Sequence, residues 1–453
     1  MSIATILLAA GKGTRMNSDV PKVLHPLAGA PMLHHAMRTA AAIDPAHMVV
    51  VGGHGLAAVR KAALAFDSAA QVVEQTEQLG TGHAARMAQP ALEGFAGTVL
   101  VMFGDTPFVR PETLEALAAA AQDAEVVVLG FEAADPGRYG RLVVEDGHLA
   151  RIVEFKDATN EERAITLCNS GVLACRSPLI WELLDEVADD NAAGEFYLTD
   201  LPALARKRDL SVTVVTCDEA ETLGINSRAE LAAADALFQS KAKDAMIADG
   251  VTLLDPGSTY LAFDTVIGRD AIIDPNVYFG PGVTVESGAH IRAFSHLEGC
   301  HVARGAIIGP FARLRPGAEL SEDTRVGNFV EIKNAQIYEG AKVNHLSYIG
   351  DATIGPAANI GAGTVTCNYD GFAKHHTEIG ACAFIGSDTM LVAPVRIGAG
   401  AMTVTGSVIT EDVPDDAVAF ARARQETKPG RAPKLFEMLK ARAAKMRAAV
   451  AKG

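Results

Sequence analysis

Hydrophobic residues follow two different rhythms along the chain, and the change falls near residue 227. Before it, short apolar runs alternate with alanine-rich amphipathic stretches such as residues 111–122. Strands that are apolar on both faces and alternate with helices are typical of a mostly parallel sheet covered by helices. The strand-like runs read TILLAA, HMVVVGG, QVVEQ, TVLVMFGD, EVVVLGFE, GVLACR and SVTVVTC. We therefore predict a Rossmann-like α/β domain over residues 1–226.

A period of six residues replaces this alternation beyond residue 250. An aliphatic or aromatic residue recurs every six positions, small residues often follow it, and five-residue steps reset the rhythm. The recurring positions are Ile267, Ile273, Phe279, Val285, Ile291, Leu297, Val302, Ile308, Leu314, Leu320, Val326, Ile332, Ile337, Ile354, Ile379, Ile385, Leu391 and Ile397. Such a repeat indicates a parallel β-helix whose short strands each send one apolar side chain to the axis. We predict a left-handed β-helix over residues 250–424.

Three segments fall outside both rhythms. Residues 227–249 contain neither Gly nor Pro and are predicted to form a helical connector. Residues 366–378, TCNYDGFAKHHTE, interrupt the six-residue repeat and are predicted to leave the coil as a loop. The stretch from Arg422 to the last residue carries ten Lys or Arg against two Glu, and residues 425–453 are predicted to be a solvated basic helix or frayed tail.

Composition narrows the class of protein. A formal net charge of -15 argues against nucleic acid or an anionic membrane as a partner. No apolar run approaches the roughly 20 residues that cross a bilayer, and the short N-terminal apolar run suits a buried strand better than a signal peptide. Six cysteines without CxxC pairs indicate reduced thiols. We expect a cytoplasmic protein, and because a solenoid has open faces, a closed homo-oligomer.

The first candidate site lies in the loop after the first strand, residues 8–22, LAAGKGTRMNSDVPK. Its glycine spacing fits neither a Walker A loop nor the dinucleotide fingerprint. Lys12, Arg15 and Lys22 could neutralise a triphosphate, and Asp105, at the end of another predicted strand, is a suitable Mg²⁺ ligand. These groups favour phosphoryl or nucleotidyl transfer. A glycine turn with surface charges explains the same residues, so the spacing alone leaves both interpretations open.

The second candidate site lies in the β-helix. Arg315 and Lys333 are eighteen residues apart, about one coil, so the two cations could stack and grip a phosphate. His345 follows twelve residues later and could act as a base near neutral pH. Solvated charges and a structural histidine are the alternative interpretation. Cys367 is not favoured as a nucleophile, because nothing in the sequence indicates a lowered thiol pKa.

A series of motifs in fixed order resembles a known family. LAAGKGTRM with DVPKVL, then EQLGTGHA, FGDTP, GRYGR, VEFKDA, NSGVL, GEFYLTD and LGINSR, resemble the sugar-1-phosphate nucleotidyltransferase domain. With the six-residue repeats appended, nearly the whole chain up to about residue 428 resembles the bacterial bifunctional N-acetylglucosamine-1-phosphate uridyltransferases and glucosamine-1-phosphate acetyltransferases. The resemblance implies acetylation of glucosamine 1-phosphate by acetyl-CoA, then uridylation of the product by UTP. The UDP-N-acetylglucosamine formed would feed peptidoglycan and lipopolysaccharide synthesis.

For the uridyltransferase half, the resemblance implies four groups of residues. Arg15 would act on the triphosphate, with Lys22 and the backbone of the loop on the nucleotide, and Asp105 and Asn226 would hold Mg²⁺. Phe103 stands where the family often has Tyr. The residues implied to contact UTP or the sugar nucleotide are Leu8, Ala9, Ala10, Gly11, Lys22, Gln75, Gly80, Thr81, Phe103, Gly104 and Asp105. Those implied to hold N-acetylglucosamine are Gly140, Glu154 and Asn169.

For the acetyltransferase half, the resemblance implies that His345 takes a proton from the sugar amino group. Asn368 could also polarise the thioester carbonyl, and Thr405 stands where Ala is common in the family. The residues implied to bind the sugar phosphate are Arg315, Lys333, Tyr348 and Asn359. The residues implied to contact acetyl-CoA are Ala362, Asn368, Tyr369, Ser387, Thr405 and Arg422. A homotrimer is implied too, because the acyl donor of such enzymes usually lies between neighbouring coils.

Two other functions are compatible with an α/β half joined to a β-helix. In a nucleotidyltransferase such as ADP-glucose pyrophosphorylase, the β-helix only regulates or assembles, which predicts no acetylation site around a histidine. His345, Asn368 and Tyr369 argue against it. A non-catalytic assembly subunit, as in a eukaryotic translation exchange factor, would be expected to lose the basic loop and the metal ligands. Lys22 and Asp105 are present.

Overall fold

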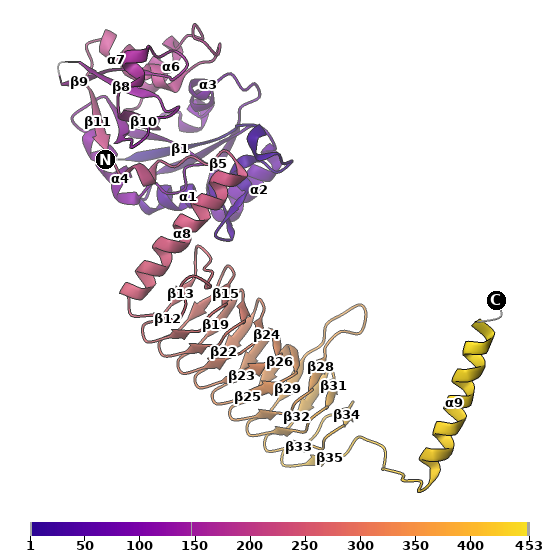
Figure 1. Cartoon of the computed structure of the whole chain (residues 1–453). Coiled ribbons are helices and arrows are strands. Elements are labelled where there is room, and N and C mark those ends of the chain that lie inside the picture. Colours follow the sequence, from indigo (N-terminus) through magenta and orange to yellow (C-terminus); the bar gives the residue numbers. More distant parts are fainter. Residues whose placement is uncertain (1, 146, 451–453) are drawn as a thin grey trace. The chain divides into compact units, whose positions relative to one another are not determined.

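The apolar runs of the first half form one sheet with helices on both faces. The computed structural model describes residues 2–145 and 147–450. The main path of the sheet is β11-β7-β10-β6-β1-β4-β5, and the hairpin β8-β9 joins it at β10 (Figure 1). The strands are β1 (Ile3–Ala9), β4 (His47–Gly52), β5 (Gln71–Glu74), β6 (Thr98–Phe103), β7 (Val126–Glu132), β8 (Arg141–Glu145), β9 (His148–Val153), β10 (Leu167–Arg176) and β11 (Val212–Thr216). A separate pair consists of β2 (Pro26–Leu27) and β3 (Ala30–Pro31).

The predicted mostly parallel sheet is confirmed along its main path, where only β10 is antiparallel; the added hairpin β8-β9 is antiparallel as well. Strand β10 runs antiparallel to both β6 and β7, while β1 pairs in parallel with β4 and β6. Strand β1 alternates between two cores, because Ile6 and Leu8 contribute to one and Leu7 and Ala9 to the other. Helices α3 (Thr81–Arg86), α6 (Leu179–Glu186) and α7 (Leu201–Lys207) pack on the first core, and α1 (Met32–Ala42), α2 (Leu56–Phe66) and α4 (Pro111–Ala120) on the second. Helix α5 (Asn160–Arg163) follows β9.

Helix α8 (Arg228–Ala248) continues the first compact unit, which runs to Val251 and also includes Pro256–Val266 and Tyr278–Val283. Ser227 caps its N-terminus, since its hydroxyl accepts a hydrogen bond from the Glu230 N–H at 3.2 Å. Gln239 exchanges two hydrogen bonds with the Leu261 backbone, at 2.7 and 3.0 Å. These contacts attach the helix to the unit that carries the first candidate site.

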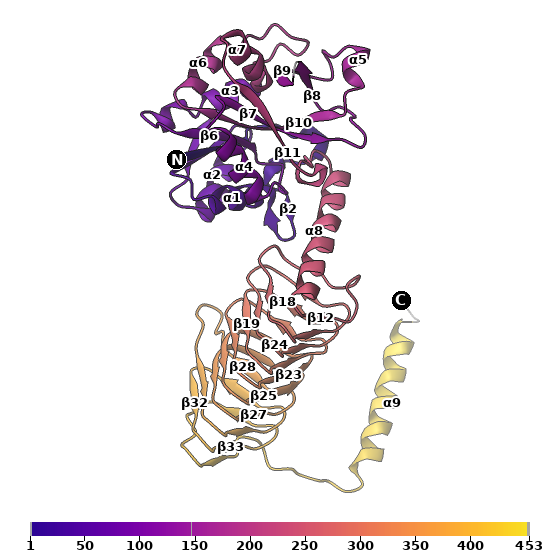
Figure 2. The ribbon, with the colours of Figure 1, turned by 90° about the vertical axis from the view of Figure 1, so that its left-hand side faces the viewer.

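The six-residue repeats build a parallel left-handed β-helix, as predicted (Figure 2). Every recurring apolar position named from the sequence is buried, none more than 9% exposed. The coils stack through two sheets of ten and fourteen strands. The first sheet contains β12 (Thr252–Leu253), β14 (Ile272–Ile273), β17 (His290–Ile291), β20 (Ile307–Ile308), β23 (Arg325–Asn328), β25 (Lys342–His345), β27 (Asn359–Ile360), β30 (Phe384–Ile385), β33 (Met402–Thr403) and β35 (Val418–Ala419).

The second sheet includes the longest strands of this unit. Its members are β13 (Val266–Ile267), β15 (Tyr278–Phe279), β16 (Thr284–Val285), β18 (His296–Leu297), β19 (Cys300–Val302), β21 (Arg313–Leu314), β22 (Ala318–Leu320), β24 (Glu331–Ile337), β26 (Tyr348–Ile354), β28 (Val365–Cys367), β29 (Thr377–Ile379), β31 (Met390–Val392), β32 (Val395–Ile397) and β34 (Val408–Ile409). The predicted loop is shorter than residues 366–378. Thr366 and Thr377 are fully buried strand residues, so only residues 368–376 leave the coil.

Positive-φ residues mark the corners of the coils in three columns, each repeating every 17 or 18 residues. The first column is Asp270, Gly288, Gly305, Asp323, Gly340 and Ala357, and the third is Gly282, Gly299, Gly317, Asn334 and Asp351. The second is Asn276, Phe294, Phe311, Phe329, Leu346 and Gly363. Gly, Asn and Asp adopt this backbone conformation most easily. Four large apolar residues in the second column therefore need another explanation.

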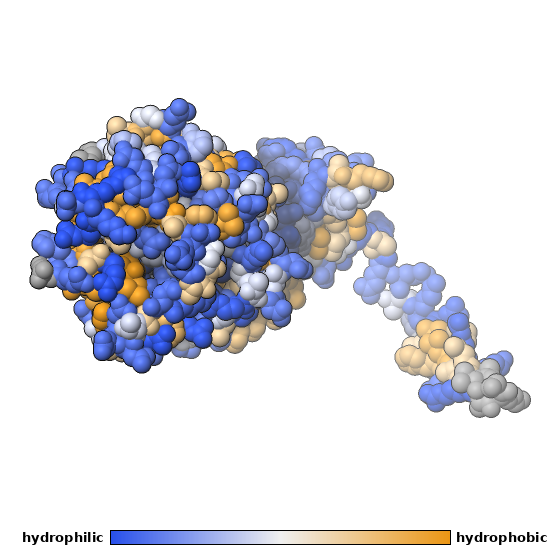
Figure 3. Space-filling view, turned by 90° about the horizontal axis from the view of Figure 1, so that it is seen from above, coloured by the Kyte–Doolittle hydropathy of each residue, from blue (hydrophilic) through white to orange (hydrophobic). Residues whose placement is uncertain are grey.

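The C-terminal segment forms α9 (Arg431–Val450), as its helical spacing predicted. Several apolar side chains on it are exposed, among them Leu435, Phe436 and Met446. Figure 3 shows that hydrophilic residues cover most of the visible face of the first unit, with apolar ones scattered between them. Within the described residues, no helix is both long and apolar enough to span a bilayer.

Candidate active sites

The first site lies where neighbouring parallel strands end. Strands β1 and β6 finish at Ala9 and Phe103, and the Gly104 N–H donates to the Leu8 carbonyl at 3.0 Å. The loop after β1 thus lies beside Asp105, at the edge where ligands bind in such sheets. A cavity of about 370 Å³ opens there. Its lining residues are Leu8, Ala9, Ala10, Gly11, Lys22, Val23, Gln75, Gln78, Gly80, Thr81, Ala84, Phe103, Asp105, Glu195 and Asn226.

A cluster of three polar side chains lies in this cavity. The Lys22 ammonium forms an ion pair with Asp105, and it donates to the Asn226 side-chain oxygen at 3.0 Å. The side chains of Lys22 and Asp105 are only 14% and 15% exposed. A carboxylate oxygen and an amide oxygen, which come from residues far apart in the sequence, therefore converge on one cation.

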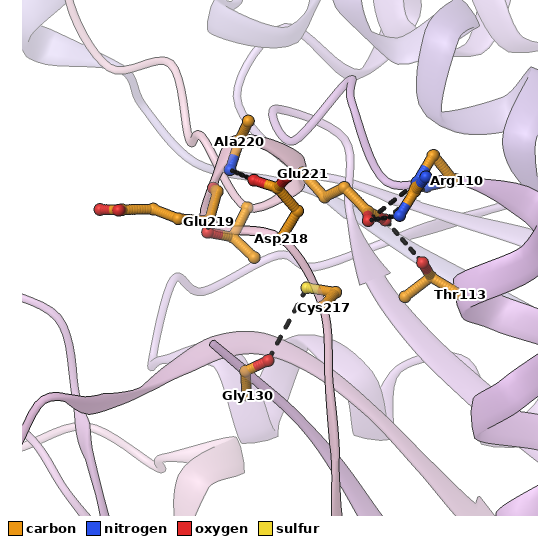
Figure 4. Close-up of polar contacts among 9 residues, drawn as sticks. Arg110, Thr113, Gly130, Cys217, Asp218, Glu219, Ala220 and Glu221 are labelled. Atoms are coloured by element: carbon orange, nitrogen blue, oxygen red, sulfur yellow. Dashed lines mark hydrogen bonds and ion pairs between the residues drawn. The ribbon is translucent and has the colours of Figure 1, made fainter. Parts of the chain in front are cut away.

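The segment that carries Asn226 is held in place by a buried carboxylate (Figure 4). Glu221 is 2% exposed and accepts hydrogen bonds from Thr113 at 2.6 Å and from the Arg110 backbone and guanidinium. Burial by itself would raise the pKa of Glu221, but the hydrogen bonds and charge of Arg110, with Thr113, lower it overall. Beyond it, the Ile225 N–H donates to the Asp105 carbonyl at 3.1 Å. The fold thus fixes Asn226 beside Asp105.

Another wall of the cavity comes from residues 75–81 and the segment that crosses them. Gln75 is 3% exposed and donates to the Gly80 carbonyl at 3.0 Å. Gly80 has φ +111°, and a Cβ there would lie 2.5 Å from the Phe196 carbonyl oxygen. The Thr81 hydroxyl accepts from the Leu198 N–H at 3.1 Å. Only glycine fits this close approach, so the wall depends on Gly80.

The three residues expected to hold N-acetylglucosamine form a separate group outside the cavity lining. The Asn169 N–H donates to the Gly140 carbonyl at 2.8 Å, and Thr199 donates to Glu154 at 3.2 Å. Burial raises the pKa of the Glu154 carboxyl. The Asn169 side chain accepts from Gly171, whose backbone lies against the Phe103 ring. Phe103 therefore links the group to the cavity.

Two residues that were predicted to contact UTP or the sugar nucleotide, Arg15 and Gly104, do not line the cavity. Several residues that do line it were not predicted from the sequence. Arg15 is exposed in a short 3-10 helix, Thr14–Met16, and does not line the cavity. Gly104 contributes its backbone below it. Val23, Gln78, Ala84 and Glu195 line the cavity but were given no role from the sequence. Glu195 could have been predicted from the sequence, because it lies in the motif GEFYLTD.

On the β-helix, the two predicted phosphate-binding cations occupy successive coils. The register pairs Leu314 with Ile332, so Arg315 and Lys333 take equivalent positions. Glu331 accepts from Arg315 at 2.8 Å. The Lys374 ammonium, from the projecting loop, lowers the pKa of Lys333 because the two like charges lie close together. Sequence spacing gave no indication that Lys374 would join this group.

His345 ends β25, at the corner marked by the positive-φ residue Leu346. The His345 side chain is exposed, and its Nδ1 lies 3.0 Å from Oδ1 of Asn328. Tyr348 opens the next strand, β26, on the other side of this corner. His345, the predicted base, and Tyr348, a predicted phosphate-binding residue, thus lie on either side of one corner of the coil.

Several predicted acetyl-CoA contacts form a column above His345. Corner hydrogen bonds connect successive coils, from the Gly363 N–H to the His345 carbonyl at 3.2 Å and from the Asp388 N–H to the Ala362 carbonyl at 2.7 Å. The Gly406 N–H donates to the Ser387 carbonyl at 2.8 Å. The column therefore runs through His345, Ala362, Ser387 and Thr405, each residue directly before its corner.

The projecting loop contributes Asn368 and Tyr369. Asn368 is 5% exposed and donates to Asp351, while the Tyr369 side chain is mostly exposed and donates to the Gly371 carbonyl at 2.6 Å. Burial raises the pKa of the Cys367 thiol, which agrees with its rejection as a nucleophile.

Two predicted residues lie away from this edge. Asn359 begins β27 and pairs with Lys342, so it lies at the opposite end of the strands from His345, which ends β25. Arg422 is exposed beyond the last strand, β35.

Comparisons with known proteins support the fold described for each half of the chain. Residues 5–221 match the MobA-like NTP transferase domain, and residues 264–299 match the bacterial transferase hexapeptide repeats. The chain is 65% identical over 445 residues to the bifunctional protein GlmU of Roseobacter denitrificans, covering 98% of this chain and 99% of that one. It is 64% identical over 453 residues to the same-named protein of Ruegeria sp. strain TM1040, covering all of both chains.

Fold, sites and domain matches define a nucleotidyltransferase joined to a hexapeptide-repeat acyltransferase. The chain belongs to the family of the bifunctional GlmU proteins. The predicted two-reaction enzyme is confirmed: it acetylates glucosamine 1-phosphate with acetyl-CoA and transfers UMP from UTP to N-acetylglucosamine 1-phosphate.

Proposed function

We propose that uridylation takes place in the cavity at the ends of β1 and β6, and acetylation at the edge of the β-helix that carries His345. The observation that supports the first assignment best is the convergence of Asp105 and Asn226 on the Lys22 ammonium. Carboxylate and amide oxygens that surround a cation inside a cavity suit a nucleotide with its metal ion. The Gly11 loop leaves room for phosphates to approach the backbone N–H groups.

Mg²⁺ fits this site as the metal. Asp105 and Asn226 supply two oxygen donors, and Lys22 stands in for a cation between them. The described residues contain no group of three or more His, Cys, Asp or Glu side chains that could hold a metal. Mg²⁺ commonly completes its shell with water and substrate phosphates, so two protein donors are enough. When bound, it would supply charge neutralisation at the transferred phosphorus.

The protein's own residues then position and neutralise the substrates. Lys22 and Arg15 would balance the charge of the UTP phosphates, and Gln75 would lie against the base. Glu154 and Asn169 would hold the sugar. A phosphate oxygen of N-acetylglucosamine 1-phosphate forms the new bond to the α-phosphorus of UTP, the bond to the bridging oxygen breaks, and pyrophosphate leaves. Such a transfer depends mainly on positioning and charge stabilisation.

At the second site, we assign the role of each residue from its position relative to His345. Arg315, Lys333 and Tyr348 would grip the phosphate of glucosamine 1-phosphate, while acetyl-CoA extends along the column of Ala362, Ser387 and Thr405. The amino nitrogen attacks the thioester carbonyl, and His345 takes the proton that nitrogen loses. The carbon–sulfur bond breaks, and the coenzyme A thiolate leaves and takes up a proton. Asn368 would face the carbonyl oxygen.

Removal of divalent metal tests this division. In EDTA, pyrophosphate release from UTP and N-acetylglucosamine 1-phosphate should fall at least about 100-fold, because Asp105 and Asn226 then lack the ion they hold. Release of coenzyme A from acetyl-CoA and glucosamine 1-phosphate should change less than about twofold, because the proposed acetylation uses His345 and no metal. The two products are followed in separate assays, and added Mg²⁺ should restore the first activity. Loss of both activities, or of neither, would contradict the assignment.

A closed homotrimer is the assembly that we propose for the β-helix. The corner residues Phe294, Phe311, Phe329 and Leu346 are 54%, 45%, 57% and 61% exposed. Neighbouring phenylalanine rings in this column stack at 5.0 and 5.3 Å. An apolar ladder in a strained backbone conformation is best explained by burial against another copy. Asn359 supports this proposal, because in one chain it lies at the opposite end of the strands from His345, so a second copy could supply it.

The ladder gives a prediction for assembly. Phe311→Glu should convert the trimer to a species of lower mass, because a charge would be buried in the subunit contact. Sedimentation or light scattering measures the mass, and Phe436→Glu, an exposed phenylalanine in α9 outside the β-helix, is the control. Acetylation should fall with the mass while uridylation persists. A trimer that survives Phe311→Glu in the folded protein would place the contact elsewhere.

The cytoplasm is the compartment that we propose, and the cysteines support it. All six are free thiols in the structure. Free thiols persist in a reducing compartment.

A further inference from the structure

We propose that Asn328 is a positioning residue for acetyl transfer: its side-chain oxygen holds His345 in the tautomer whose Nε2 can take a proton. The inference rests on the proposed role of His345 as the base and adds the group that orients it. Asn328 lies five residues before Lys333, one of the predicted phosphate-binding residues, and has no predicted role of its own.

The fold places the two side chains next to each other. Strands β23 and β25 are parallel neighbours, and their register pairs Asn328 with His345. Paired residues of adjacent parallel strands send their side chains to the same face. Both strands end at these residues, since the next ones, Phe329 and Leu346, have φ of +55° and +51°. The Leu346 N–H donates to the Asn328 carbonyl at 3.1 Å, which ties the two corners together.

Hydrogen bonds also fix the His345 backbone. Its carbonyl accepts from the Ser347 hydroxyl at 2.8 Å and from the Gly363 N–H at 3.2 Å. The ring is then oriented by its Nδ1, 3.0 Å from the Asn328 Oδ1. A catalytic imidazole needs such a second contact, because its ring otherwise rotates freely at an exposed edge.

The chemistry of the amide decides which nitrogen is the base. The side-chain oxygen of asparagine only accepts hydrogen bonds, so the His345 Nδ1 must carry the hydrogen. A neutral imidazole has one N–H, which leaves Nε2 with a free lone pair. The atom that takes the proton from the sugar amine is therefore Nε2, on the side of the ring away from Asn328.

The neutrality of the amide also matters. A carboxylate in the same place would orient the ring equally well but would stabilise the imidazolium, so more of the base would already be protonated at neutral pH. Within the described residues, no acidic side chain forms an ion pair with His345. The nearby Glu331 is engaged by Arg313 and Arg315. Asn328 thus supplies orientation without negative charge.

Three variants test the proposal. Asn328→Ala should lower kcat of acetylation about 10- to 100-fold and leave KM for glucosamine 1-phosphate within about threefold, because orientation of the base is lost and phosphate binding is not. Asn328→Asp keeps the acceptor, so its kcat should approach wild type at high pH, with the acid limb of the pH profile moved up by about one pH unit. Gln336→Ala, which removes another outward amide, hydrogen bonded to Ser321, is the control.

Nuclear magnetic resonance of labelled histidine gives a second readout. The His345 ring should show the Nδ1–H tautomer in the wild type and a mixture in Asn328→Ala. The proposal is overturned if Asn328→Ala keeps full acetylation, or if Asn328→Asp is as impaired as Asn328→Ala at every pH in a folded protein. If His345→Ala itself keeps acetylation, the proposed base is wrong, which is a different outcome from failure of Asn328 alone.

Discussion

Asp105→Ala is expected to lower kcat/KM for uridylation at least about 10³-fold and to leave acetylation within about twofold of wild type. Two effects combine in this loss. The variant removes the only carboxylate among the three converging side chains, and with it the main Mg²⁺ ligand that we propose. It also leaves the Lys22 ammonium without its charged partner, in a site where the side chains of Lys22 and Asp105 are about 15% exposed.

Asp105→Asn separates these effects from simple misfolding. The amide preserves the shape of the side chain, and the backbone carbonyl of residue 105 still accepts from the Ile225 N–H. We expect Asn to fold as well as wild type and to lose most of the uridylation. Initial rates of pyrophosphate release, measured over a range of Mg²⁺ concentrations, give the result. Asp123→Ala, an exposed aspartate after α4, is the matched control.

The assignment of the first site would be wrong if Asp105→Asn kept near wild-type uridylation in the folded protein. It would also be wrong if the variant lost acetylation to the same extent, since the proposed acetylation site contains no residue of the first unit.

His345→Ala should have the reverse effect, a fall in kcat for acetylation of about 10² to 10⁴-fold with uridylation unchanged. The amine of glucosamine 1-phosphate must lose a proton as it attacks, and the variant removes the group proposed to accept it. KM for the sugar phosphate should stay within about threefold, because Arg315 and Lys333 still bind the phosphate. The residual rate should rise with pH, because hydroxide and water can then accept the proton.

Release of coenzyme A, followed with a thiol reagent, measures this prediction. His290→Ala is the control, because His290 is an outward-facing histidine of the same sheet, paired with Asp274 at 2.8 Å and three strands before β25. Near wild-type acetylation by His345→Ala would exclude the histidine as base. Loss of uridylation as well would instead indicate damage beyond the second site.

The pattern of apolar residues predicted the strands of both units well, because buried side chains must recur with the period of the secondary structure that buries them. Each strand-like run of the first half became a strand, and each six-residue position became part of the β-helix axis. The hairpin β8-β9 escaped prediction because its residues mix apolar and charged side chains. The antiparallel direction of β10 also escaped, since an apolar run does not encode which way its strand points.

In the candidate sites, contacts between residues far apart in the chain could not be predicted from the sequence either. The resemblance named Asp105 and Asn226, but only the fold brings their oxygens to the Lys22 ammonium, across 204 residues between Lys22 and Asn226. Spacing could not reveal Lys374, because it comes from a loop that interrupts the repeat. Asn328 lies one coil before His345, but spacing alone does not show that the two side chains form a hydrogen bond.

The sequence by itself determined that this chain joins an α/β half to a six-residue repeat and that its motifs resemble a two-reaction enzyme, because periodicity and motifs are properties of neighbouring residues. Only the tertiary structure decided which polar groups meet: Asp105 with Lys22 and Asn226, and His345 with Asn328. The reason is physical, since hydrogen bonds and ion pairs act over about 3 Å in space whatever the separation along the chain.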